Sequence, residues 1–328
     1  MNMSVTSDVE WQQKTAAVMG GAGFIGSWVV DKLVQRGFGR IVIVDNFFLG
    51  KESNLSYAKS QLGERLKVHT LDAMQLEPLK SVFWKEEHVD VVYNLAVKPL
   101  LVSFIDPFGV FETSVKIAQN LLEIQRLDMF DVLVQVSSSE AYGSAKRVPM
   151  DEEHPLNPTT PYGAGKAAAD HLVTSYILAY GIEAAIIRPF NCYGPRQNDR
   201  SYAAIVPTVI KRILHNEPPI IYGDGNQTRD YTFVEDTASA IVEGGLRKEA
   251  KGEIINVATG REVPITDLVK MITLQMGHQG SIIHEKERPG DVRRHCADIS
   301  KAKKLLHFSP KVTYEEGLRR TIEWYSDD

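Results

Sequence analysis

The stretch Gly20-Gly21-Ala22-Gly23-Phe24-Ile25-Gly26 decides how the rest of the chain is interpreted. It lies between an apolar run at 15–19, which predicts a strand, and residues 27–34, whose apolar side chains recur at helical spacing. Such a turn is typical of dinucleotide-binding folds, because glycine permits a tight turn and a close approach to a pyrophosphate. The amides that begin the helix then face the phosphates. The residues predicted to contact the dinucleotide are Gly20, Gly23, Phe24, Ile25 and Gly26.

A carboxylate ends the next predicted strand. The apolar run 41–44 leads into Asp45, about 20 residues beyond the turn, which is the spacing that the dinucleotide-binding pattern requires. A carboxylate at that point accepts hydrogen bonds from a free ribose diol and repels a 2′-phosphate. Asp45 therefore predicts NAD rather than NADP as the cofactor, and the adjacent Asn46 is assigned to the same contact.

Composition limits the class of protein. A chain of 328 residues can bury a large core, and its net charge of -5 without a basic cluster disfavours nucleic acid as a partner. No apolar run approaches the ~20 residues of a membrane span, and residues 1–14 form a polar tail without a signal-peptide core. Cys192 and Cys296 are the only cysteines, which suits a reducing compartment and offers no metal-ligand cluster. We expect a cytoplasmic protein with no metal, membrane or nucleic-acid partner.

Strands and helices alternate over the first 190 residues, which predicts an α/β fold with a doubly wound parallel sheet of the Rossmann type. Further strands are expected at 66–71, 89–96, 132–136 and 183–187, helices at 77–87, 108–127 and 162–180, and a polar connection at 46–60. Beyond residue 190 the alternation breaks down. We predict an NAD-binding domain at 15–190 and a smaller substrate-binding region at 191–328, some segments of which return to the first domain.

Three side chains near the ends of these elements predict hydride-transfer chemistry. Tyr162 and Lys166 are four residues apart at the start of a helix, so both lie on one face. Tyrosine is a poor base at its ordinary pKa of ~10, but a lysine ammonium and a positive nicotinamide ring would lower that pKa towards neutrality. Ser138, at a strand end, can donate to the same substrate oxygen. The phenolate would then take a hydroxyl proton while the hydride passes to NAD.

Further motifs accompany the glycine turn. They are Asp45, Asp72, and the segments 137–143, 161–166 and 188–191. Together they resemble the extended short-chain dehydrogenase/reductases, specifically the NAD-dependent nucleotide-sugar epimerases and dehydratases, over roughly residues 15–325. The resemblance implies cofactor contacts at Asp72, Ala73, Ala96, Lys98, Tyr162, Lys166 and Pro189. It implies contacts to a nucleoside-diphosphate sugar at Ser139, Asn191, Arg229, Arg288 and Asp291. Arginine suits a diphosphate because guanidinium binds phosphate oxygens bidentately.

Two positions depart from the family pattern. Ser114 stands where the family usually has asparagine, and Leu49 stands where it has a polar residue after Asp45. Both substitutions put a cofactor contact in question.

Glu140 leaves the reaction open. A 4-epimerase needs only Tyr162, Lys166 and Ser138, because a transient 4-keto sugar rotates and takes the hydride back on its other face. A carboxylate at position 140 resembles the 4,6-dehydratases, where it removes the proton at sugar carbon 5, and the UDP-glucuronate decarboxylases. Against this, the segments 202–207 and 288–293 look like those of UDP-hexose 4-epimerases. We predict a 4-epimerase, with the dehydratase as the alternative; Glu140 could also serve only to anchor its loop.

Two further expectations concern the whole molecule. A non-catalytic NAD-binding scaffold of the same fold would be expected to lack the Tyr162/Lys166 pair, and this chain keeps it. The resemblance also implies a homodimer through the helices 108–127 and 162–180. Their surplus apolar residues are Ile117, Leu121, Leu122, Val173, Ile177 and Leu178.

Overall fold

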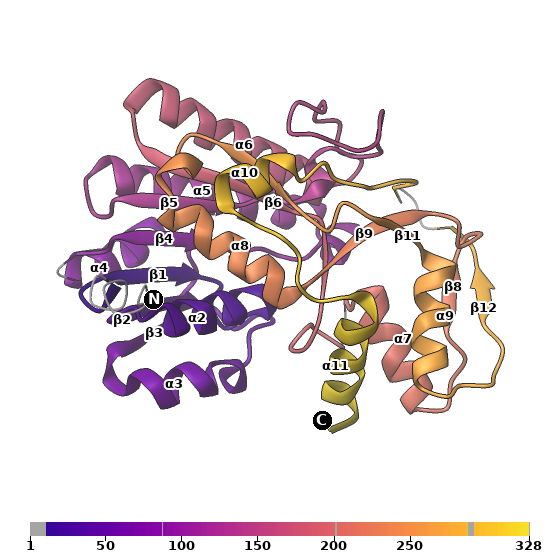
Figure 1. Ribbon diagram of the computed structural model, residues 1–328. Coiled ribbons are helices and arrows are strands. Elements are labelled where there is room, and N and C mark those ends of the chain that lie inside the picture. Colours follow the sequence, from indigo (N-terminus) through magenta and orange to yellow (C-terminus); the bar gives the residue numbers. More distant parts are fainter. Residues whose placement is uncertain (1–10, 87, 201, 288–291, 328) are drawn as a thin grey trace, which may run out of the picture.

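A seven-stranded parallel sheet forms the larger of two lobes in a computed structural model, which describes residues 11–86, 88–200, 202–287 and 292–327 (Figure 1). The strand order is β10-β6-β5-β4-β1-β2-β3, and every pairing is parallel. The strands are β1 (Thr15–Met19), β2 (Arg40–Asp45), β3 (Leu66–Thr70), β4 (Val91–Asn94), β5 (Val132–Val136), β6 (Glu183–Pro189) and β10 (Ile254–Val257). The order reverses between β1 and β4, and ligands bind at such a switch point, beyond the carboxyl ends of the strands.

Helices cover both faces of this sheet. Side chains alternate along each strand, so Ala16 and Val18 of β1 pack on one helical layer while Ala17 and Met19 pack on the other. The first layer consists of α2 (Phe24–Arg36), α3 (Ser56–Leu62), α8 (Val234–Leu246) and α10 (Ser300–Leu306). The second layer consists of α4 (Leu76–Lys85), α5 (Pro107–Arg126) and α6 (Pro161–Tyr180). The two layers bury the near-continuous apolar strands that a parallel sheet requires.

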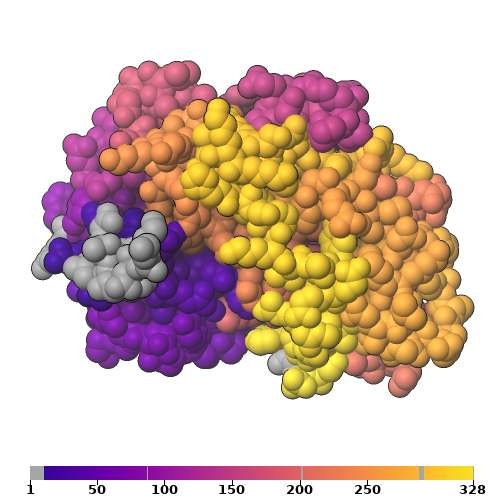
Figure 2. All heavy atoms as spheres, viewed as in Figure 1, coloured from indigo at the N-terminus to yellow at the C-terminus, as the bar shows by residue number. Residues whose placement is uncertain are grey.

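The smaller lobe has its own apolar core. Its strands are β7 (Asn191–Tyr193), β8 (Ile220–Tyr222), β9 (Thr228–Phe233), β11 (Glu262–Pro264) and β12 (Ile283–Glu285), and its helices are α7 (Ile205–Leu214), α9 (Ile265–Gln275) and α11 (Tyr314–Asp327). The C-terminal residues, yellow in Figure 2, run across the surface between the lobes. Leu306 belongs to the core of the first lobe and Leu318 to that of the second, so this segment joins the two.

The predicted fold class is confirmed, with one difference in detail. The stretch 46–60 is not only a polar connection, because it contains most of α3; this helix buries only Ala58 and Leu62, too few apolar positions to give a periodic signal. Beyond residue 190, β10 pairs with β6 in the main sheet. The domain limits at 14 and 190 stay a prediction. In the described part of the chain, the helices are all too short or too polar to cross a membrane.

Candidate active site

A cavity of about 630 Å³ opens at the carboxyl ends of the central strands, and both lobes line it. It brings together all the predicted cofactor and catalytic residues. These are Gly20, Gly23, Phe24, Ile25, Gly26, Asp45, Asn46, Asp72, Ala73, Ala96, Lys98, Ser138, Glu140, Tyr162, Lys166 and Pro189. Of the predicted substrate residues, Ser139, Asn191 and Arg229 also line it, whereas Arg288 and Asp291 lie outside the described residues.

The glycine turn has the shape that a dinucleotide needs. Gly20 has a φ of +76°, and a Cβ on it would lie 2.9 Å from the Ala96 nitrogen. A Cβ on Gly26 would lie 2.0 Å from the Gly20 carbonyl oxygen, so only glycine lets α2 begin this close to the turn. Gly23 caps α2 without a side-chain hydrogen bond to the first-turn amides. The turn therefore fits a pyrophosphate that binds at the helix N-terminus.

Asp45 lies at the end of β2, buried against the glycine turn. Its Oδ2 accepts a hydrogen bond from the Ala22 amide at 2.9 Å, and its Oδ1 accepts one from the Phe47 amide at 2.8 Å. Burial raises the pKa of this carboxyl above its ordinary value, and the two amides oppose that rise. The carboxylate is thus held rigidly in the cavity wall, where a ribose diol can reach its remaining lone pairs.

The two departures from the family pattern have different outcomes. Leu49 lines the cavity, so the polar residue that the family has there is replaced by an apolar wall. The hydroxyl of Ser114 donates to the Val110 carbonyl at 3.3 Å within α5, and a Cβ on Gly165 of α6 would lie 3.2 Å from its Cβ. Ser114 therefore packs between the two helices, and the neighbouring Thr113 lines the cavity.

The predicted catalytic residues meet at the start of α6. A hydrogen bond joins the Ser138 side chain to the phenol of Tyr162, and this bond acts to lower the pKa of Tyr162. The Lys166 ammonium nitrogen lies 5.9 Å from the centre of the Tyr162 ring and donates to the Val136 carbonyl at 2.7 Å. The arrangement holds a proton acceptor, a hydrogen-bond donor and a cation side by side.

Burial of Tyr162 opposes the lowering of its pKa that the sequence predicts. Burial raises the pKa of Tyr162 to about 12; Ser138 opposes this rise and the charge of Glu140 adds to it. Burial also lowers the pKa of Lys166 to about 8. These values belong to the protein without cofactor, whereas the predicted lowering includes the charge of a bound nicotinamide ring.

The substrate side contains three buried polar groups, two of which the sequence did not single out. Asn191 Nδ2, Gln197 Oε1 and Gln227 Oε1 are buried in residues that line the cavity, and each lacks a hydrogen-bond partner among the described residues. Buried polar atoms of this kind are costly unless a ligand satisfies them. Asn191 was predicted, but Gln197 and Gln227 were missed. For Gln227, its position two residues before the predicted Arg229 was the available signal.

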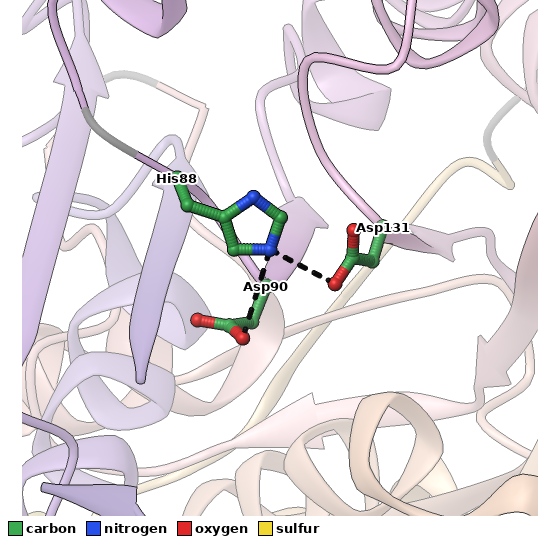
Figure 3. Close-up of side chains that lie close together, drawn as sticks. All are labelled: His88, Asp90 and Asp131. Carbon is green, nitrogen blue, oxygen red and sulfur yellow. Dashed lines mark hydrogen bonds and ion pairs between the residues drawn. The ribbon is translucent and has the colours of Figure 1, made fainter. Parts of the chain in front are cut away.

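A second polar cluster lies at the opposite edge of the sheet (Figure 3). His88 Nε2 is 3.0 Å from an Asp131 carboxylate oxygen and 3.9 Å from one of Asp90. Asp90 already pairs with Lys14 at 2.6 Å and accepts the Thr15 amide at 2.7 Å. Because Asp90 is already bound by these two donors, the cluster provides no argument for a bound metal.

The chain belongs to the GDP-mannose 4,6-dehydratase family, whose model matches residues 17–321. This family consists of enzymes, among them epimerases and dehydratases of the extended short-chain dehydrogenase/reductase type. A putative UDP-glucose 4-epimerase of Methanocaldococcus jannaschii is 35% identical, over 95% of this chain and 98% of that protein.

Two solved structures share the fold. The UDP-glucose 4-epimerase of Thermotoga maritima, with UDP-glucose, is 30% identical, with a TM-score of 0.89 over 95% of this chain and 99% of that one. The dTDP-glucose 4,6-dehydratase DesIV of Streptomyces venezuelae, with NAD bound, is 27% identical, with a TM-score of 0.87 over 96% and 97%. The similarity thus extends over epimerases and dehydratases alike.

Proposed function

We propose that this protein is an NAD-dependent nucleotide-sugar 4-epimerase that acts on a UDP-hexose through a transient 4-keto sugar. One observation carries the proposal: Ser138, Tyr162 and Lys166 converge in the cavity that the glycine turn and Asp45 also line. The relative from M. jannaschii and the structure from T. maritima, both named as UDP-glucose 4-epimerases, support this choice of reaction.

The residues of the cavity have distinct tasks in this reaction. NAD, when bound, would supply the reversible acceptor for the hydride of sugar carbon 4. Tyr162, as the phenolate, takes the proton of the 4-hydroxyl and gives it back to the ketone oxygen. Ser138 donates a hydrogen bond to that oxygen, and Lys166 stabilises the phenolate by its charge. Asn191 and Arg229 hold the diphosphate while the 4-keto sugar rotates between the two hydride transfers.

A 4,6-dehydratase is the second candidate, because Glu140 lines the cavity close enough to raise the pKa of Tyr162. A 4-keto group makes the proton at carbon 5 acidic, so a carboxylate beside Tyr162 is a sufficient base to remove it. A UDP-glucuronate decarboxylase would use the same oxidised intermediate. The 27% identity to DesIV is compatible with the dehydratase reaction.

The test is turnover of a panel of UDP-, dTDP-, GDP- and CDP-sugars in D₂O, with products identified by NMR. The epimerase predicts interconversion of 4-epimers of a UDP-hexose with no deuterium on carbon. Deuterium at carbon 5 with loss of water would overturn the proposal in favour of the dehydratase, and release of carbon dioxide would favour the decarboxylase. Tyr162→Phe is the control for background reactions. Failure with every sugar, in protein that binds NAD, would indicate a non-catalytic scaffold.

We also propose that the protein is a homodimer, through α5 and α6. Four of the six residues predicted for this interface are instead buried in the sheet core, namely Ile117, Leu121, Leu122 and Val173. Leu178, which was also predicted, is 82% exposed, and two residues that were not predicted add to this surface: Phe108 is 75% exposed and Tyr180 59%. Large apolar side chains exposed to this extent favour an interface. The cytoplasmic location stays a prediction.

A further inference from the structure

A buried ion pair lies directly behind the candidate catalytic residues. Asp170 follows Lys166 by one helical turn on α6, and Arg188 belongs to β6. The Arg188 Nε donates to Asp170 Oδ2 at 2.9 Å, and the two side chains are only 2% and 1% exposed. Burial of two charges is costly, and such a pair often adds little to stability. The contacts of this pair indicate another role.

The ion pair forms hydrogen bonds with both ends of the loop at 137–142. We call this segment, which carries Ser138 and Glu140, the serine loop. At the start of the loop, the Ser137 hydroxyl donates to Asp170 Oδ2 at 2.6 Å. At its end, Arg188 donates to the Tyr142 hydroxyl at 2.9 Å and lies 4.7 Å over the Tyr142 ring. Tyr142 is itself anchored, because its hydroxyl donates to Asn256 Oδ1 at 2.8 Å. Asp170 and Arg188 thus fix the loop relative to α6 and β6.

The same pair sets the electrostatic surroundings of Lys166. Burial lowers the pKa of Lys166, and Asp170 is the group whose charge opposes that lowering. Tyr162, on the same helix, is the ionisable side chain whose ring lies near Lys166, and Glu140 on the serine loop acts on Tyr162. Arg188 on β6 acts on Asp170: it pairs with the buried carboxyl and opposes the rise in its pKa that burial causes, so it keeps Asp170 ionised.

We propose that Asp170 is a positioning residue, which holds the serine loop and presents a negative charge to Lys166, and that Arg188 keeps this carboxyl ionised. The reaction that benefits is the proposed hydride transfer, since an ammonium at position 166 stabilises the Tyr162 phenolate. The effect on Lys166 itself, however, can be measured without any substrate.

The test is trace labelling of Lys166 by acetic anhydride as a function of pH, in the full-length protein as purified, with the labelled peptide quantified by mass spectrometry. The wild-type titration midpoint is expected at about 8. Asp170→Asn should lower the midpoint by about one unit or more, because a nearby opposite charge is lost. Arg188→Met should also lower it, because the buried carboxyl of Asp170 then loses the cation that keeps it ionised. Ser137→Ala, which removes a hydrogen bond but no charge, should leave it close to the wild-type value.

Non-additive shifts are the decisive result: the double variant Asp170→Asn/Arg188→Met should have the midpoint of Asp170→Asn, because Arg188 acts on Lys166 only through the charge of Asp170. Unchanged midpoints, additive shifts, or a Ser137→Ala shift as large as that of Asp170→Asn would overturn the proposal. Circular dichroism checks folding. If Asp170→Asn does not fold, the double variant replaces it, and its midpoint must lie below the wild-type value. Lack of turnover with these shifts present would refute the proposed function and leave the role of Asp170 intact.

Discussion

Replacement of Glu140 by glutamine is the perturbation that bears most directly on the reaction. The two side chains have almost the same shape, so the change removes the charge and keeps the backbone contacts of the serine loop. These contacts include the Glu140 amide, which donates to Ser138 Oγ at 3.2 Å, and the Gly143 amide, which donates to the Glu140 carbonyl at 3.2 Å. A Cβ on Gly163 would lie 2.4 Å from that carbonyl oxygen, so the loop is also fixed sterically against α6.

The sign and size of the effect follow from the charges at Tyr162. Glu140 raises the pKa of Tyr162, so its neutralisation lowers that pKa; burial and the Ser138 hydrogen bond are both larger influences. We expect a shift of about one unit or less, where a full unit corresponds to ~1.4 kcal/mol and to tenfold more phenolate below the pKa. For an epimerase, the acid limb of the kcat profile should therefore move to lower pH, and turnover on that limb should rise by up to about tenfold.

The assay is the pH dependence of 4-epimerisation, followed by NMR, together with the absorbance of reduced nicotinamide in the enzyme. Ser138→Ala is the matched control, because loss of its hydrogen bond should move the acid limb to higher pH. If Glu140→Gln abolishes product formation while reduced cofactor accumulates, Glu140 is the base at carbon 5 and the epimerase is wrong. An acid limb that stays in place or moves to higher pH would refute the electrostatic coupling of Glu140 to Tyr162.

Three further outcomes are expected. Tyr162→Phe should keep the fold and bound NAD but reduce turnover by about a hundredfold or more, and retention of over about a tenth of the activity would assign the base to another residue. Asp45 should make calorimetry show tighter binding of NAD than of NADP, and Asp45→Ser should narrow that difference; equal affinities in the wild type would contradict its assignment. Light scattering should give a dimer at micromolar concentration, and Phe108→Glu should shift it towards monomer, because Phe108 is 75% exposed on α5. A monomeric wild type would refute the proposed dimer interface.

The sequence was sufficient to predict the parallel sheet and the residues proposed to contact the nucleotide, because both depend on local patterns. The glycine turn, the apolar strands and the carboxylate of Asp45 are set by neighbours in the chain, and the carboxyl ends of parallel strands meet at one edge whatever the details of packing. The pair Tyr162 and Lys166 was predictable for the same reason, since helical spacing alone places both side chains on one face.

Tertiary structure decided what depends on distant contacts. The return of β10 to the main sheet, and the turn of Ser114 towards α6 rather than the cavity, follow from packing between segments far apart in the chain. The same holds for the pKa of Tyr162: burial raises it to about 12 in the protein alone, which opposes the lowering that the sequence predicts with nicotinamide bound. Burial is a property of the whole fold, and so is the pairing of Asp170 with Arg188, which joins a helix and a strand 18 residues apart. The chemical groups of the site can thus be identified from the local sequence. Their protonation states, in contrast, depend on their three-dimensional surroundings.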